Sequence, residues 1–116
     1  MTVTIWHNPR CSKSRQTLAL LRDRGSEPEI VEYLKTPPDA ATLRDTLAKL
    51  DLAPRDLMRR GEAVYKERGL ADPALGDDAL IAAMVAGPIL IERPVVMSGE
   101  RAAIGRPPEA VLGILD

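Results

Sequence analysis

The sequence predicts an α/β fold in which a mixed sheet is assembled from the two ends of the chain. Two short apolar runs around an amphipathic segment indicate a strand–helix–strand opening, and two more near the end indicate a strand–strand–helix close. Between them, over about residues 39–87, the periodic segments are all helical. A chain of 116 residues can bury a core, and we expect one domain over residues 1–116.

The opening predicts two parallel strands. Val3–Trp6 forms the first, and the turn signal Asn8-Pro9 ends it. A helix follows from Cys11 to Arg24, with Gly25 placed to cap its end. The second strand takes in Ile30–Tyr33, and the crossover between the strands has the length that a parallel pair requires.

The central segment predicts four short helices. Asp39–Leu50 carries leucines at helical spacing, and Pro54–Met58 is a helical turn that starts with proline. Glu62–Arg68 is a short helix that ends before Gly69. A fourth helix begins at Asp77, because acidic side chains suit the positive end of a helix dipole.

The end of the chain predicts a hairpin and a last helix. Val95–Met97 and Arg101–Ile104 form the strands, with a turn over Ser98–Glu100, and Pro107-Pro108 begin the helix. The whole order is βαβ, helices, ββα. This order is typical of a thioredoxin-like fold with a helical insertion between its two halves.

The composition excludes several classes of protein. A net charge of -1 argues against binding nucleic acid or an anionic membrane through bulk charge. Met1–Trp6 lacks the features of a signal peptide, and no apolar run approaches the roughly 20 residues of a membrane helix. The single cysteine rules out an internal disulfide and fits a reducing compartment. We therefore expect a cytoplasmic protein, and a monomer.

Cys11 is the first candidate for chemistry. It stands where the first strand passes into the first helix, beside Arg10, Lys13 and Arg15. The N–H groups of a helix start and nearby cations lower a thiol pKa from its ordinary value of about 8.5, and the thiolate is the nucleophilic form. The pattern Cys11–Ser14 is C-x-x-S, a dithiol motif with its second sulfur replaced by a hydroxyl. The alternative is that Cys11 is a small buried apolar residue.

His7 is the only histidine. It either supports Cys11 electrostatically or hydrogen-bonds the backbone at the end of the strand. Because no further histidine or cysteine exists outside this loop, we expect no metal site.

Four arginines are candidates for binding a tetrahedral oxyanion, which a guanidinium fork and a helix N-terminus both favour. They are Arg59, Arg60, Arg93 and Arg106, although most arginines are solvated surface charges. Pro94 follows one of them. It is either an ordinary trans proline or a cis proline packed against the cysteine loop, and the sequence does not choose between the two.

The sequence resembles the ArsC arsenate reductases of the glutaredoxin-coupled type along nearly its whole length. The segments that carry the resemblance are, in order, His7–Arg15, Tyr33–Pro38, Leu57–Arg59, Asp77-Asp78, Pro88–Val96 and Ile104–Glu109. The resemblance implies a thioredoxin-like fold and the reduction of arsenate to arsenite. Glutathione would be the co-substrate, glutaredoxin the protein partner, and no cofactor would be bound.

The resemblance also implies roles for single residues. Cys11 corresponds to the nucleophile that forms a covalent arsenic adduct, while His7, Ser14 and Arg15 belong to the loop that holds its thiolate. The residues that correspond to the family's three anion-binding arginines are Arg59, Arg93 and Arg106. Arg59 is preferred to Arg60 because it directly follows a pair of apolar residues, as the family's arginine does.

Three alternatives remain beside the reductase. The first is a Spx-like redox regulator that binds RNA polymerase, although such proteins commonly have a second cysteine where this chain has Ser14. The second is a thiol transferase like a monothiol glutaredoxin, and the third is an ArsC-like protein without arsenate activity. The loop also carries Ser12-Lys13 where well-known members have Gly-Thr, and some members have a longer C-terminal tail.

Overall fold

The computed structural model of this chain describes residues 2–115 and divides the chain into two units. The first unit joins Met1–Thr36 to Arg93–Asp116, and the second is Pro37–Glu92. The helical segment between the two halves of the sheet is therefore a unit of its own. That both units belong to one domain stays a prediction.

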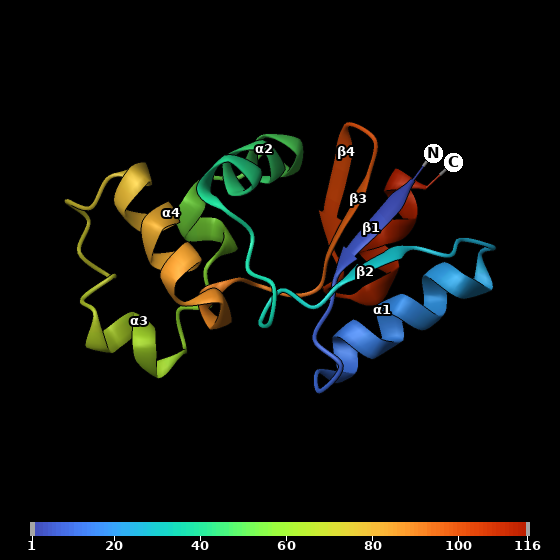
Figure 1. The fold of residues 1–116 in the computed structure, drawn as a ribbon, viewed down its shortest axis with the longest axis horizontal. Helices are drawn as coiled ribbons and strands as arrows, with labels where there is room; N and C mark the ends of the chain where they lie inside the picture. Colours follow the sequence, from blue (N-terminus) through green and yellow to red (C-terminus); the bar gives the residue numbers. More distant parts are fainter. Residues whose placement is uncertain (1, 116) are drawn as a thin grey trace. The chain divides into compact units, whose positions relative to one another are not determined.

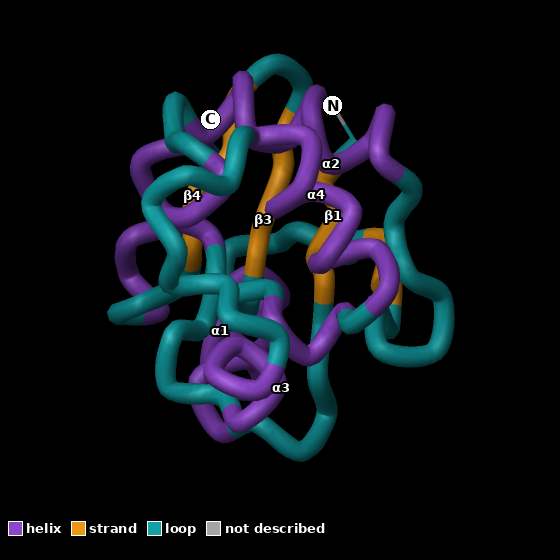
Figure 2. Tube along the Cα trace, turned by 90° about the vertical axis from the view of Figure 1, so that its left-hand side faces the viewer, coloured by secondary structure: helices purple, strands orange, loops and turns teal. Residues whose placement is uncertain are grey.

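A four-stranded mixed sheet forms the centre of the first unit. The strands are β1 (Val3–Trp6), β2 (Glu29–Val31), β3 (Val95–Ser98) and β4 (Arg101–Ile104), in the order β2-β1-β3-β4. β1 pairs in parallel with β2 and antiparallel with β3, which pairs antiparallel with β4. Figure 2 shows β1, β3 and β4 side by side in that order. The expected α/β class and mixed sheet are confirmed.

Two helical segments cover one face of this sheet. α1 (Ser12–Asp23) and the 3-10 helix η3 (Pro108–Ile114) contact each other, and Figure 1 shows both against the strands. Alternate residues of a strand point to the same face, so β1 and β3 send apolar side chains toward these helices. The buried core of this layer consists of Val3, Ile5, Leu21, Val96 and Val111.

Local signals place the ends of these elements as expected. Gly25 adopts a left-handed φ of 81°, and its N–H donates to the carbonyl of Arg22, which closes α1. Gly99 has a φ of 61° in the turn between β3 and β4. Both positions need the conformational freedom of glycine.

Two expectations for this unit were wrong in detail. The last helix, Pro108–Ile114, is a 3-10 helix rather than an α-helix, a distinction that apolar spacing over seven residues does not make. β2 ends at Val31, so Tyr33 lies in a turn instead of a strand, although its side chain is only 1% exposed. Its burial explains why the sequence pattern placed it in the strand.

The second unit is helical, as expected. Its elements are α2 (Ala40–Leu50), η1 (Pro54–Leu57), α3 (Ala63–Glu67), α4 (Asp77–Ala86) and η2 (Pro88–Leu90). Asp39 caps α2 by accepting a hydrogen bond of 2.8 Å from the N–H of Thr42. The short η2 was not predicted, because a proline-led turn of three residues leaves no periodic pattern.

Within residues 2–115, no helix has the length and apolar character needed to cross a membrane. In the same part of the chain, no three His, Cys, Asp or Glu side chains come together.

Candidate active site at Cys11

The loop between β1 and α1 positions Cys11 by backbone hydrogen bonds. The N–H of His7 donates to the carbonyl of Val31 at 2.8 Å, which extends the pairing of β1 with β2 by one residue. The N–H of Cys11 donates to the carbonyl of Asn8 at 3.0 Å. Cys11 itself is the extended N-cap residue of α1, so its sulfur lies at the end of a helix that points N–H groups outward. The residue is partly exposed and a reagent can reach it.

The buried polar side chains of His7 and Ser14 contact each other and hold this loop. Nδ1 of His7 lies 2.6 Å from Oγ of Ser14, and both residues are buried. The same hydroxyl accepts a hydrogen bond of 3.0 Å from the N–H of Asn8. Burial lowers the pKa of His7 below its ordinary value, which favours the neutral ring. His7 therefore influences Cys11 indirectly, by holding Ser14 and the loop.

Two arginines from the other half of the sheet lie beside the sulfur. Nη2 of Arg106 is 3.8 Å from Sγ of Cys11, and Nε of the same guanidinium donates to the carbonyl of Arg93 at 2.8 Å. The Arg93 side chain lies close enough to Cys11 for its charge and its N–H groups to lower the pKa of the thiol. The loops before β3 and after β4 thus bring two positive charges to one cysteine.

These neighbours change the acidity of Cys11. Partial burial acts to raise the pKa of its thiol, but the N–H of Ser14, the charge of Arg93 and the N–H of Lys13 outweigh it. The net result is a pKa below the ordinary value of a cysteine. The environment favours the thiolate, which is the form that attacks an electrophile.

Arg15 and Pro94 shape the loops around the cysteine. Nη1 of Arg15 donates to the carbonyl of Pro9 at 2.9 Å, so this side chain clamps the loop before Cys11. The peptide bond between Arg93 and Pro94 is cis, which answers the question that the sequence left open. The Arg106–Pro107 bond is also cis.

Arg59 and Arg60 belong to the second unit. The N–H of Arg59 donates to the carbonyl of Leu90 at 2.7 Å, and its Nη1 pairs with Glu62 at 2.6 Å. Arg60 is more exposed and lies 3.5 Å from Asp56. Arg59 is thus held by both its backbone and its side chain, and its part in an anion site stays a prediction.

Sequence reasoning treated Asn8 only as a turn residue and so missed its role in the site. Its N–H donates to Ser14, its carbonyl accepts from Cys11, and its Oδ1 accepts from the N–H of Arg10 at 3.0 Å. Asparagine side chains often hydrogen-bond the backbone two residues further on, and this tendency could have indicated that Asn8 shapes the loop before Cys11.

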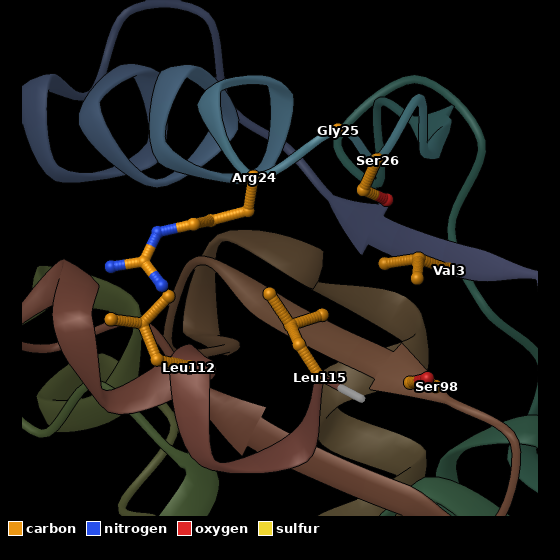
Figure 3. Close-up of a pocket in the computed structure, with 7 residues that line it drawn as sticks. All are labelled: Val3, Arg24, Gly25, Ser26, Ser98, Leu112 and Leu115. Atoms are coloured by element: carbon orange, nitrogen blue, oxygen red, sulfur yellow. The ribbon is translucent and has the colours of Figure 1, made fainter.

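A separate pocket lies at the far end of β1 and contains none of the predicted site residues. Figure 3 shows Arg24 extending from the end of α1 toward Leu112 of η3. Val3 and Ser98 lie at the strand side of the pocket, whose volume is about 590 Å³. Since Cys11 follows the opposite end of β1, this pocket takes no part in the chemistry of the thiol.

The fold and the site together define a class of protein. A thioredoxin-like sheet presents one cysteine at the start of its first helix, with two guanidinium groups at the sulfur. The chain matches the model of the ArsC family over residues 6–114, and it belongs to that family.

Known relatives resemble the chain over almost its full length. It is 59% identical over 114 residues to the uncharacterized protein YfgD of Escherichia coli (strain K12), covering 97% of this chain and 96% of that protein. It is 49% identical to the arsenate reductase of Neisseria meningitidis serogroup A, covering 97% of each. The solved structure of the arsenate reductase from Vibrio cholerae superposes with a TM-score of 0.97 at 51% identity, covering 99% of this chain and 98% of that one.

Proposed function

We propose that this protein reduces arsenate to arsenite, with Cys11 as the nucleophile and with glutathione and glutaredoxin as the source of electrons. The observation that carries the proposal is the pair of guanidinium groups of Arg93 and Arg106 beside a cysteine of lowered pKa. Arginine forks match a tetrahedral oxyanion, so the same groups that favour the thiolate can hold its substrate. The named relatives are arsenate reductases, which agrees with this chemistry.

The first step is attack of the Cys11 thiolate on arsenic. A sulfur–arsenic(V) bond forms, and one arsenate oxygen takes up a proton and leaves as water. Arg93 and Arg106 neutralise the negative charge that remains on the other oxygens. Arg59 is proposed as the third cation for these oxygens, in preference to Arg60.

The remaining steps use thiols from outside the chain, because Cys11 is its only cysteine. Glutathione displaces a second oxygen as water and forms a second sulfur–arsenic bond. A glutaredoxin thiolate then attacks the glutathione sulfur, and the electron pair of that bond passes to arsenic. Arsenic(V) becomes arsenic(III) while a mixed disulfide of glutaredoxin and glutathione forms. Hydrolysis of the last bond releases arsenite and the free Cys11 thiol.

His7, Ser14 and Arg15 are proposed to hold the loop in which the thiolate forms. The 2.6 Å contact between His7 and Ser14 fixes the first helical turn, whose N–H groups face the sulfur. Arg15 fixes the segment before Cys11 through the carbonyl of Pro9. We further propose that the protein is cytoplasmic, because the reaction needs the reduced glutathione pool. We also propose that it is a monomer and that it binds no cofactor.

A coupled assay tests this function. Purified protein is mixed with glutathione, glutaredoxin, glutathione reductase and NADPH, and NADPH oxidation is followed when arsenate is added. We expect oxidation that stops when arsenate, glutathione or glutaredoxin is left out. In a second assay without glutaredoxin, NADPH oxidation that depends on this protein and on a glutathionylated peptide, together with none with arsenate in the full assay, would instead indicate a thiol transferase.

A further inference from the structure

Gly105 lies in an unusually tight space between α1 and the start of β3. A Cβ atom built on Gly105 would lie 2.5 Å from Oγ1 and 3.1 Å from Cγ2 of Thr17. On its other side, the same atom would lie 2.8 Å from Cγ of Pro94. Contacts this short do not occur between real side chains, so only glycine fits between these two neighbours.

Neither neighbour can easily move aside. Thr17 is fully buried, and its hydroxyl donates to the carbonyl of Lys13 at 2.8 Å, which ties it to the first turn of α1. Pro94 is buried and has a ring of fixed shape. The N–H of Gly105 donates to the carbonyl of Pro94 at 2.9 Å, so the backbone is held at this point as well.

The three residues of this contact are close in sequence to Cys11, Arg93 and Arg106. Thr17 belongs to the helix that starts at Cys11, and Gly105 immediately precedes Arg106. Pro94 immediately follows Arg93, whose carbonyl accepts from Nε of Arg106. The packing of Thr17, Pro94 and Gly105 therefore sets the spacing between the sulfur and both guanidinium groups.

We propose that Thr17, Pro94 and Gly105 are positioning residues, which hold the Arg93 and Arg106 loops against the helix of Cys11. The inference deepens the proposed function, because it rests on these arginines serving both the thiolate and the oxyanion. Arg93 and Arg106 lie on separate loops, and the strands hold each loop only where it joins the sheet. A packing contact between these loops and α1 is therefore needed to keep both guanidinium groups near the sulfur.

The geometry gives the size of the expected effect. Moving a Cβ at position 105 from 2.5 Å to an ordinary contact of 3.4 Å would require a displacement of about 0.9 Å. A misplacement of about 1 Å in a catalytic site can reduce the rate by about 100-fold. We therefore expect Gly105→Ala to move Arg106 away from Cys11 and to weaken the affinity for a bound anion by about 10- to 100-fold.

Gly113 provides a matched control. It lies in η3 of the same unit, and a Cβ built there meets nothing within 4 Å. Gly105→Ala and Gly113→Ala thus add the same methyl group to the same unit, with and without the steric conflict. Thr17→Ala in the Gly105→Ala background removes the two Thr17 atoms in conflict and should restore part of the site.

The test uses iodoacetamide alkylation of Cys11, which needs no arsenate turnover. The alkylation rate is first measured as a function of pH, which gives the thiol pKa. It is then measured at increasing concentrations of arsenate or phosphate, which shows how strongly the anion protects Cys11. We expect Gly105→Ala to raise the thiol pKa and to need at least 10-fold more anion for protection. Gly113→Ala should behave as wild type, and the double variant should lie between.

A folded Gly105→Ala protein with wild-type pKa and wild-type anion protection would overturn the proposal. If Gly105→Ala does not fold, Thr17→Ala alone gives the answer, because it opens the same contact. Its alkylation should then show a raised thiol pKa and weaker protection, and wild-type values would overturn the proposal. A wild-type protein that binds anions but reduces no arsenate would overturn the proposed function and leave this inference standing.

Discussion

The reactivity of Cys11 depends on a few residues that come from two separate segments. Ser14 and Lys13 present N–H groups from the first turn of α1, and Arg93 adds a positive charge from the other half of the chain. Partial burial opposes them, but these groups together keep the pKa of the thiol below its ordinary value. The lowered pKa of Cys11 is therefore a property of the folded chain more than of the C-x-x-S pattern.

The first prediction concerns the pH dependence of alkylation. Only the thiolate reacts, so the lowered pKa keeps Cys11 reactive at a lower pH than an ordinary thiol. Arg93→Ala removes a charge that favours the thiolate, and the midpoint of rate against pH should move to higher pH. Arg24→Ala, which removes an arginine at the far pocket of the same unit, should leave the midpoint unchanged. Equal midpoints for all three proteins would contradict the role of Arg93.

The second prediction concerns Ser14. Ser14→Ala leaves the ring of His7 and the N–H of Asn8 without the hydroxyl that both contact. An unsatisfied buried polar group costs about 1–3 kcal/mol, and the free energy of unfolding should fall by that amount. Urea denaturation measures it, with the exposed Ser12→Ala as a control expected to lie within about 0.5 kcal/mol of wild type. Equal losses in both variants would contradict this account.

Whole elements were largely predictable from local signals. Each strand and all but one of the helical segments could be recognised from apolar spacing, proline or glycine, because those signals lie within the element itself. The exceptions have physical causes. Tyr33 is buried without belonging to a strand, and η2 is too short to show a period.

An interaction within the second unit leads to a third prediction. Arg55 of η1 donates to the hydroxyl of Tyr65, to the carbonyl of Leu70 and to the carbonyl of Asp72. Arg55→Ala should therefore speed amide hydrogen exchange in the segment after α3, over about residues 69–75. Arg60→Ala, whose side chain has one weak ion pair, should not change this exchange. Slow exchange in both variants would show that Arg55 does not hold the segment.

At the scale of the whole molecule, the sequence offered candidate residues for the site but not the contacts among them. Cys11, Arg93 and Arg106 could be named from motifs, and the fold brings them together. The close approach of Thr17 to Gly105 could not be foreseen, since it joins distant segments and depends on distances that no local pattern contains.

The fourth prediction addresses the third arginine. Removing one donor to a developing oxyanion typically lowers the rate by about 100- to 1,000-fold. Arg59→Ala should lower the kcat/KM for arsenate by about this factor, whereas Arg60→Ala should change it little. Steady-state kinetics on both variants measures the difference, and the reverse order would assign the role to Arg60.

The central claim is that Cys11 attacks arsenate, and Cys11→Ser tests it most directly because only the sulfur changes. Wild type and Cys11→Ser are compared for arsenate-dependent NADPH oxidation with glutathione and glutaredoxin present. The account predicts turnover by the wild type and none above background by Cys11→Ser, with both proteins folded. Equal arsenate-dependent rates in the two proteins would contradict it.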